Sequence, residues 1–127
     1  MQKITWLLRI VGAIQIILGS LYLFAPTTFL VSMGHSIPEA DIFYPFSMLA
    51  ARFYAFGIAL FYISKSPEQH KFWIYLLIFI QVIDLAGGLF YSISNVVSLS
   101  LSAFPMFNAL LIIILALLWM PKDKQHA

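Results

Sequence analysis

The chain has 127 residues, of which 62% are hydrophobic and 9% are charged, with a formal net charge of +2 at pH 7. Its mean hydropathy is +0.95, whereas an ordinary soluble domain is roughly half apolar and about a quarter charged. Because a small domain buries only part of its surface, this composition excludes a typical water-soluble protein and indicates an integral membrane protein. The absence of cysteine excludes disulfides, thiolate catalysis and cysteine-ligated metals, and the few scattered lysines do not indicate a partnership with nucleic acid.

Four stretches are long and apolar enough to cross the hydrocarbon core, which takes roughly 20 helical residues. They are Ile4–Phe24, Phe43–Ile63, Phe72–Tyr91 and Leu101–Met120. Prolines stand close to their ends, as expected where helices begin or stop. Pro105 falls in the first turn of the last stretch, where its missing N–H costs little. We therefore expect an all-α protein: one four-span domain over residues 1–127, folded as an antiparallel four-helix bundle.

The first stretch is expected to be a retained span, since a signal peptide would look different. Arg9 interrupts its apolar run, which continues to Phe24, and no small-x-small cleavage site precedes Pro26.

The connection of residues 25–42 holds two further patterns. Ser36 and Glu39 fit the S-x-x-E capping box, which predicts that the second helix begins outside the membrane near Ile37. The segment TTFLVSM, residues 27–33, fits either a short interfacial helix over the mouth of the bundle or an irregular apolar loop.

The lysines predict how the bundle is oriented. They lie before the first span, around the turn between the second and third, and after the fourth, at positions 3, 65, 71, 122 and 124. The connections 25–42 and 92–100 contain no Lys or Arg. By the positive-inside rule both termini are cytoplasmic, and the three tryptophans near the same ends fit an interfacial belt. We expect a multi-pass protein of the cell membrane, in bacteria the inner membrane.

A layer of polar residues is predicted at one depth of the bundle. Lys65 and Lys71 flank the turn between the second and third spans. Arg52 lies 65 − 52 = 13 residues before Lys65, and Asp84 lies 84 − 71 = 13 residues after Lys71. At 1.5 Å per residue both are ~20 Å from the cytoplasmic boundary, in the outer half of the core. The same count in the other two spans reaches Gln15 and Asn108.

Arg52 and Asp84 are expected to form a buried ion pair, completed by Gln15 and Asn108, with Gln81 on the Asp84 face at i−3. A lone charge at this depth costs at least a few kcal/mol, and arginine can hold a carboxylate with two parallel bonds. Such a pair indicates either a functional site or a device that fixes helix register.

Aromatic and glycine residues surround this layer in the outer half. Tyr22, Tyr54 and Tyr91, with Gly88, are candidates for the lining of a pocket for a hydrophobic ligand, and an interfacial belt is the alternative. The pair Gly87 and Gly88 is expected to serve close helix packing. We predict no metal site and no cofactor, because every histidine lies in a loop or tail, away from haem or zinc geometry. A quinone site needs no metal and stays open.

The layout resembles the DoxX-like group of small bacterial four-helix membrane proteins. The features that carry the resemblance are GSLYLFAP at the end of the first span, AARFYAFGIAL in the second and IDLAGG in the third. Because that group includes a quinol-oxidase-associated subunit, the resemblance is compatible with an accessory role in a membrane complex.

Three hypotheses follow. The first is a non-catalytic membrane protein whose Arg/Asp site binds a small or lipid-like molecule, a quinone among the candidates, or that docks a larger membrane complex. The alternative is a small proton- or ion-coupled transporter or channel working as a homo-oligomer, in which Asp84 alternately takes up a proton or cation and releases Arg52. The least favoured is an intramembrane enzyme acting on an isoprenoid or lipid. Besides the lipid bilayer, the expected partners are therefore a hydrophobic small molecule, a second copy of the chain or a membrane complex.

Overall fold

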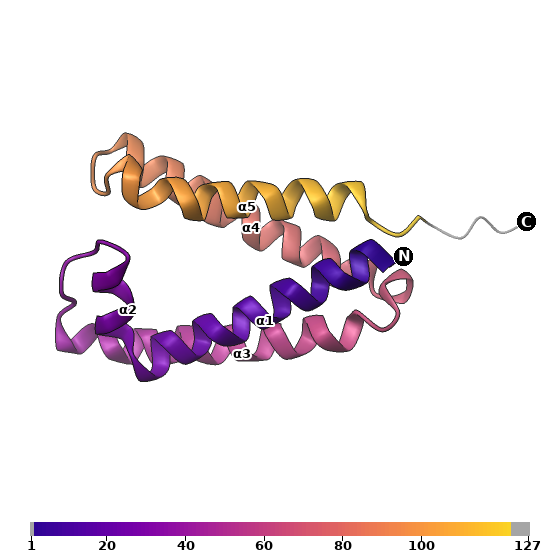
Figure 1. Cartoon of the computed structure of the whole chain (residues 1–127), viewed down its shortest axis with the longest axis horizontal. Coiled ribbons are helices and arrows are strands. Elements are labelled where there is room, and N and C mark those ends of the chain that lie inside the picture. Colours follow the sequence, from indigo (N-terminus) through magenta and orange to yellow (C-terminus); the bar gives the residue numbers. More distant parts are fainter. Residues whose placement is uncertain (1, 123–127) are drawn as a thin grey trace, which may run out of the picture. The chain divides into compact units, whose positions relative to one another are not determined.

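The computed structural model describes residues 2–122 and is built from helices and their connections. In chain order these are α1 (Gln2–Phe24), α2 (Pro26–Ser32), the 3-10 helix η1 (Ala40–Ile42), α3 (Phe43–Ile63), the 3-10 helix η2 (Pro67–Gln69), α4 (Lys71–Ile93) and α5 (Leu99–Leu118) (Figure 1). The predicted all-α class is confirmed. The four predicted spans are confirmed as well, since α1, α3 with η1, α4 and α5 are each long and apolar enough to cross a membrane.

The chain divides into two compact units. Unit 1 comprises Met1–Leu7 and Ile63–Ala127, and unit 2 comprises Leu8–Tyr62. Unit 2 therefore holds most of α1, the short helix α2 and nearly all of α3, whereas unit 1 holds α4 and α5 together with the first turns of α1.

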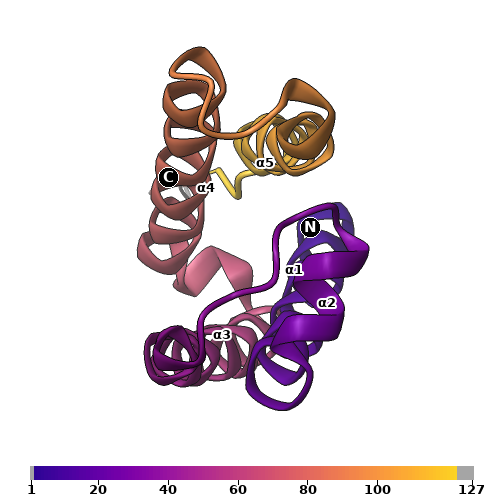
Figure 2. The same cartoon turned by 90° about the vertical axis from the view of Figure 1, so that its left-hand side faces the viewer.

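Unit 2 is built on a close antiparallel contact between α1 and α3, which run side by side in both views (Figures 1 and 2). Small residues on each helix form this contact, which we call the α1/α3 seam. Gly12 faces Gly57 and Gly19 faces Ala50, so both helices place their small residues seven apart. A Cβ atom at Gly12 would lie 3.1 Å from the carbonyl oxygen of Gly57. Small residues let the two backbones approach closely, as in membrane helix pairs generally.

The segment after α1 folds into the short helix α2, which confirms the helical interpretation of residues 27–33 against the loop. Pro26 occupies its first position, where a missing N–H costs little. Gly34 ends the helix with a φ of 99°. The amide of Gly34 donates to the carbonyl of Val31 and that of His35 to the carbonyl of Leu30, which is the Schellman arrangement of a helix C-terminus.

The predicted helix start near Ile37 is wrong. Residues 35–39 are not helical, η1 begins at Ala40, and Glu39 is extended with a ψ of 148° and no side-chain cap hydrogen bond. The reason lies in Pro38, because a residue that precedes proline is pushed away from the helical region. Ile37 would have to be helical for Ser36 and Glu39 to form the capping box.

Unit 1 is built on the antiparallel hairpin of α4 and α5, which lie side by side in both views (Figures 1 and 2). Gly88 packs against Met106, and the hydroxyls of Ser92 and Ser102 share a hydrogen bond. These two contacts fix the register of the hairpin. Gly88 therefore serves close packing as predicted, but Gly87 does not, since a Cβ atom there would meet no atom of the hairpin within 4 Å.

The hairpin helices extend further toward their connection than predicted. α4 continues to Ile93, and Asn95, just past its C-cap Ser94, has a φ of 61°. The amides of Asn95 and Val96 donate to the carbonyls of Ser92 and Tyr91 in a second Schellman arrangement.

Since α5 begins at Leu99, Pro105 lies inside the helix, and the prediction that it stands in the first turn is wrong. The missing N–H of Pro105 deprives the carbonyl of Leu101 of its helical donor.

The first turns of α1 belong to unit 1 and contact two other segments of it. The Thr5 hydroxyl donates to the carbonyl of Ser64, just after α3, at 3.0 Å. The Lys3 ammonium lies 5.9 Å from the centre of the Trp119 ring, just after α5. One end of unit 1 therefore gathers the start of α1, the turn before α4 and the end of α5.

Candidate functional site

Arg52 lies in unit 2, in the middle of α3, and its side chain is exposed. Its Nη1 donates to the carbonyl of Met48 in the preceding turn of the same helix, at 2.9 Å. At ~100° per residue, Arg52 is rotated by roughly 150° from Ala50 and Gly57 of the α1/α3 seam. Its guanidinium is therefore carried on the side of α3 that faces away from α1.

Asp84 lies in unit 1, in the middle of α4, and is exposed as well. It stands three residues after Gln81 and four before Gly88, so these residues share one side of the helix. Gln81 is 4% exposed, and Gly88 contacts Met106, so Asp84 flanks the contact with α5. The described residues of unit 1 offer its carboxylate neither a hydrogen bond nor an ion pair.

The two helix registers place the predicted polar residues at similar levels within each unit. Because Gly12 faces Gly57, Gln15 is level with position 54, two residues from Arg52. The hairpin contacts likewise make Asn108 level with position 86, two residues from Asp84. Two residues correspond to about 3 Å along a helix axis.

The same residues occupy different faces of their helices. Gln15 is 8% exposed and lies in the α1/α3 seam, where its Cβ would be 3.2 Å from a Cβ at Gly57. Arg52 lies on the far side of α3 from that seam. Asn108 is half-buried and is rotated by roughly 160° around α5 from Met106.

Arg52 and Asp84 belong to separate units, so their ion pair and the four-residue layer stay predictions. The structure shows what surrounds each of the two charged side chains within its own unit. Both lie on long apolar helices, and neither is neutralised by an opposite charge among the described residues of its own unit.

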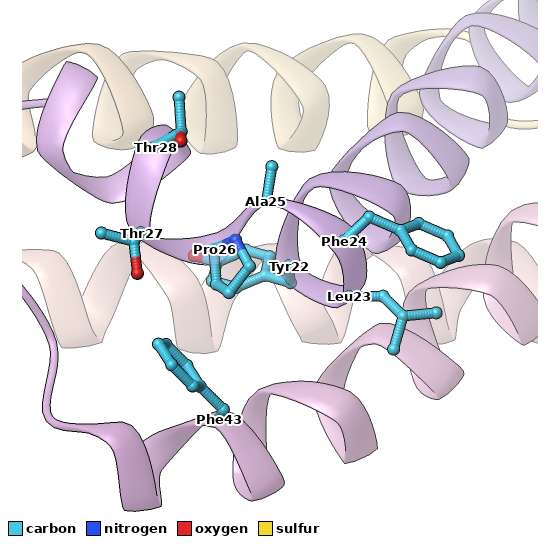
Figure 3. A pocket seen from close by; sticks show the side chains of 8 residues that line it. All are labelled: Tyr22, Leu23, Phe24, Ala25, Pro26, Thr27, Thr28 and Phe43. Carbon is cyan, nitrogen blue, oxygen red and sulfur yellow. The ribbon is translucent and has the colours of Figure 1, made fainter.

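An open pocket lies at the end of unit 2 that carries α2 (Figure 3). Its volume is about 350 Å³. It is lined by the end of α1, the start of α2 and the start of α3: Tyr22, Leu23, Phe24, Ala25, Pro26, Thr27, Thr28 and Phe43. In Figure 3 the Thr27 hydroxyl and the Phe43 ring point toward the same space, with Pro26 and Tyr22 beside it. The pocket thus offers aromatic and aliphatic walls with a hydroxyl at the edge.

Tyr22 anchors this pocket to the rest of unit 2 through an aromatic cluster. Its ring centroid lies 5.3 Å from that of Phe29 in α2, 5.3 Å from that of Phe46 and 5.7 Å from that of Phe53 in α3. Edge-on and stacked pairs at such distances add to the stability gained by burial. The cluster therefore holds α2 and α3 to the end of α1 and fixes one wall of the pocket.

The other residues predicted to line a pocket have structural partners. Tyr54 shares a 2.6 Å hydrogen bond with Ser20, whose hydroxyl donates to the carbonyl of Ile16. Since that donation uses the only hydroxyl hydrogen of Ser20, Tyr54 is the donor to it. Tyr91 is half exposed and contacts Phe90 edge-on, with centroids 5.1 Å apart.

Of the eight residues that line this pocket, sequence reasoning named only Tyr22. The signal for those around Pro26 was the position of this proline at the end of the first span, because a chain that turns a corner there brings the start of the next helix back beside the end of the preceding one. Among residues 2–122, no three His, Asp or Glu side chains gather in a way that could hold a metal ion.

The resemblance to DoxX-like proteins stays a prediction drawn from the quoted segments. Neither a protein-family model, nor a curated protein, nor a solved structure matches this chain significantly.

Proposed function

We propose that this chain is a non-catalytic protein of the cell membrane that binds a small or lipid-like molecule in its outer half, with Arg52 and Asp84 at the polar end of the site. The observation that carries the proposal is the state of Asp84. It sits mid-span on α4, and the described part of unit 1 provides it with no hydrogen bond or opposite charge. Since a bare carboxylate in hydrocarbon costs at least a few kcal/mol, it needs a partner from elsewhere.

Arg52 is the proposed partner. Its depth, counted from the hairpin lysines, equals that of Asp84, and its own unit satisfies it only through a backbone carbonyl. Guanidinium and carboxylate together can orient a polar head group such as a quinone carbonyl, because arginine keeps spare N–H donors after gripping a carboxylate.

The lysine distribution supports an orientation in which both termini and the turn around Pro67 are cytoplasmic. The end of unit 2 that carries α2 and the pocket lined by Tyr22 and Phe43 would then lie at the outer face of the membrane. An accessory role in a membrane complex, as the DoxX-like resemblance implies, fits the same site with a partner subunit supplying further walls.

The experiment is ligand-induced thermal stabilisation of the purified protein by short-chain ubiquinone and menaquinone. Asp84→Asn keeps the shape of the side chain and removes its charge. We expect it to abolish the stabilisation by ligand while lowering the unliganded melting temperature less. Asp41→Asn, the same change in the exposed η1 turn, is the matched control and should keep the stabilisation. If neither quinone stabilises the parent protein, or if Asp84→Asn lowers only the unliganded stability, the binding function is wrong and a structural role is left.

The second candidate function is a proton- or ion-coupled transporter or channel working as an oligomer. The same observation favours it, because a carboxylate without a fixed partner in its hairpin can take up a proton or a cation. Reconstituted vesicles should then show flux that depends on Asp84 and not on Asp41. Vesicles without proton-coupled or ion flux over a broad pH range would exclude this function.

A further inference from the structure

A second pocket lies entirely within unit 1, where α1 begins and α5 ends. Its volume is about 760 Å³. The first residues of α1 and the residues at and after the end of α5 line it: Gln2, Lys3, Ile4, Leu118, Trp119, Met120, Pro121 and Lys122. It thus lies at the ends of two apolar spans, which in a membrane is the boundary between acyl chains and head groups.

Two of the lining residues are cations, and one of them is held in place by an aromatic ring. The Lys3 ammonium lies 5.9 Å from the centre of the Trp119 ring, within the range of a cation–π interaction. Lys122 also lines the pocket and is exposed. A lysine whose ammonium group lies over a tryptophan ring is positioned beside the pocket, and its N–H donors stay available for a second partner.

Apart from Gln2, the remaining lining residues are apolar. Ile4 and Pro121 are buried, and Leu118 is 72% exposed at the side of the helix end. A ligand here would therefore meet two ammonium groups and an indole at one level and an apolar surface directly beside them. These surroundings match the successive parts of a phospholipid, which are a charged phosphate, the glycerol region and the beginning of an acyl chain.

We propose that the pocket between the start of α1 and the end of α5 binds the head group of an anionic phospholipid, with Lys3 and Lys122 contacting its phosphate and Trp119 lying at the level of its glycerol. Charge complementarity selects this occupant, because basic pockets between spans on the cytoplasmic side bind anionic head groups. The proposal does not depend on the ligand site at Arg52 and Asp84.

The same end of unit 1 offers an internal control. Lys65 directly follows Ser64, whose carbonyl accepts the Thr5 hydroxyl, and Lys71 begins α4. Both lie near the pocket's end of the unit but outside its lining. Replacing Lys65 and Lys71 by Gln removes as much charge from this end as replacing Lys3 and Lys122. A general attraction to an anionic surface would respond equally to both pairs.

The test uses Trp119 as a reporter of its lipid neighbours, with Trp6 and Trp73 replaced by Phe. The protein is reconstituted in phosphatidylcholine vesicles in which an equal fraction of the lipid is brominated phosphatidylglycerol or brominated phosphatidylcholine. We expect severalfold stronger quenching by the phosphatidylglycerol. Lys3→Gln with Lys122→Gln should abolish this excess, and Lys65→Gln with Lys71→Gln should leave it. The ratio between the two lipids is compared because loss of the Lys3 contact changes the emission of Trp119 itself.

Equal quenching by both lipids in the parent protein would overturn the proposal, as would an equal loss of the excess in the two double variants. Loss of the excess upon addition of inorganic phosphate at constant ionic strength would also overturn it, since it would assign the pocket to free phosphate. Native mass spectrometry of the unmodified chain with the two lipids guards against misfolding of the tryptophan variants. It should show retained phosphatidylglycerol, and no preference between the lipids would contradict the proposal.

Discussion

A methyl group added at Gly57 would lie 2.8 Å from the carbonyl oxygen of Gly12, which faces it across the α1/α3 seam. Such a contact is too short for carbon and oxygen, and the obstacle on the far side is backbone. The side chain of Ile16 closes the remaining space, also at 2.8 Å. The closeness of the two helices in unit 2 therefore depends on the absence of a side chain at this position.

Gly57→Ala should lower the free energy of unfolding, because α1 and α3 must move apart to make room and lose their packing. Overpacking of this kind costs roughly 1–3 kcal/mol. The measurement is reversible unfolding in detergent or steric trapping in a bilayer. Gly87→Ala is the matched control: no atom of its hairpin lies within 4 Å, so it should be neutral or gain up to about 1 kcal/mol in helix propensity. Equal effects of the two changes would show that the seam is not tightly packed.

Gly88→Ala should destabilise unit 1 through a single flexible neighbour. A Cβ atom at Gly88 would lie 2.5 Å from Cγ and 2.9 Å from the sulfur of Met106. Because the obstacle is a side chain, Met106→Ala should relieve it, and the double variant should be more stable than the sum of the single changes implies. Coupling energies between touching residues are about 0.5–3 kcal/mol. Strict additivity in a double-mutant cycle would contradict the register of α4 against α5.

The proposed topology is testable with particular clarity because the chain has no native cysteine. Ser36→Cys lies in the connection before η1 and Gln69→Cys lies in η2, and both positions are exposed. In intact bacterial cells a membrane-impermeant maleimide should label the Ser36→Cys variant, whereas the Gln69→Cys variant should react only after permeabilisation. The reverse pattern would place the lysine-rich end outside, and labelling of both variants in intact cells would indicate two orientations.

Much of the fold could be predicted because an apolar run of span length crosses a bilayer as an α-helix, which satisfies all of its backbone hydrogen bonds internally. The boundaries of α3 agree with the predicted Phe43–Ile63, and α2 is the helical one of the two alternatives that residues 27–33 left open. Errors arose where two local signals competed. Ser36 and Glu39 fit the capping-box pattern, but Pro38 disfavours a helical conformation of Ile37, so no helix begins there. Pro105 suggested that the helix begins close to it, but the helix already begins at Leu99.

The sequence predicted the height of each polar residue along its helix, but not the face of the helix on which it lies. Counting residues from the lysines placed Gln15 near Arg52 and Asn108 near Asp84 in height, and the helix registers agree within each unit. Which way a side chain points depends on which face of its helix packs, and this was set by features that counting ignores. Gly12 and Gly57 direct the packing of α1 on α3, so Gln15 lies in the seam while Arg52 lies on the other side of its helix.

The central claim, a pair between Arg52 and Asp84, is tested most directly by the distance between their charged groups in a bilayer. Solid-state NMR dipolar recoupling between ¹⁵N-labelled guanidinium groups and ¹³C-labelled aspartate carboxyls measures it, since the chain has only two arginines, Arg9 and Arg52. The account predicts dephasing that corresponds to an ion pair, with N···O within about 4 Å, that persists in Arg9→Lys and disappears in Asp84→Asn. No dephasing, or dephasing unchanged by Asp84→Asn, would contradict it.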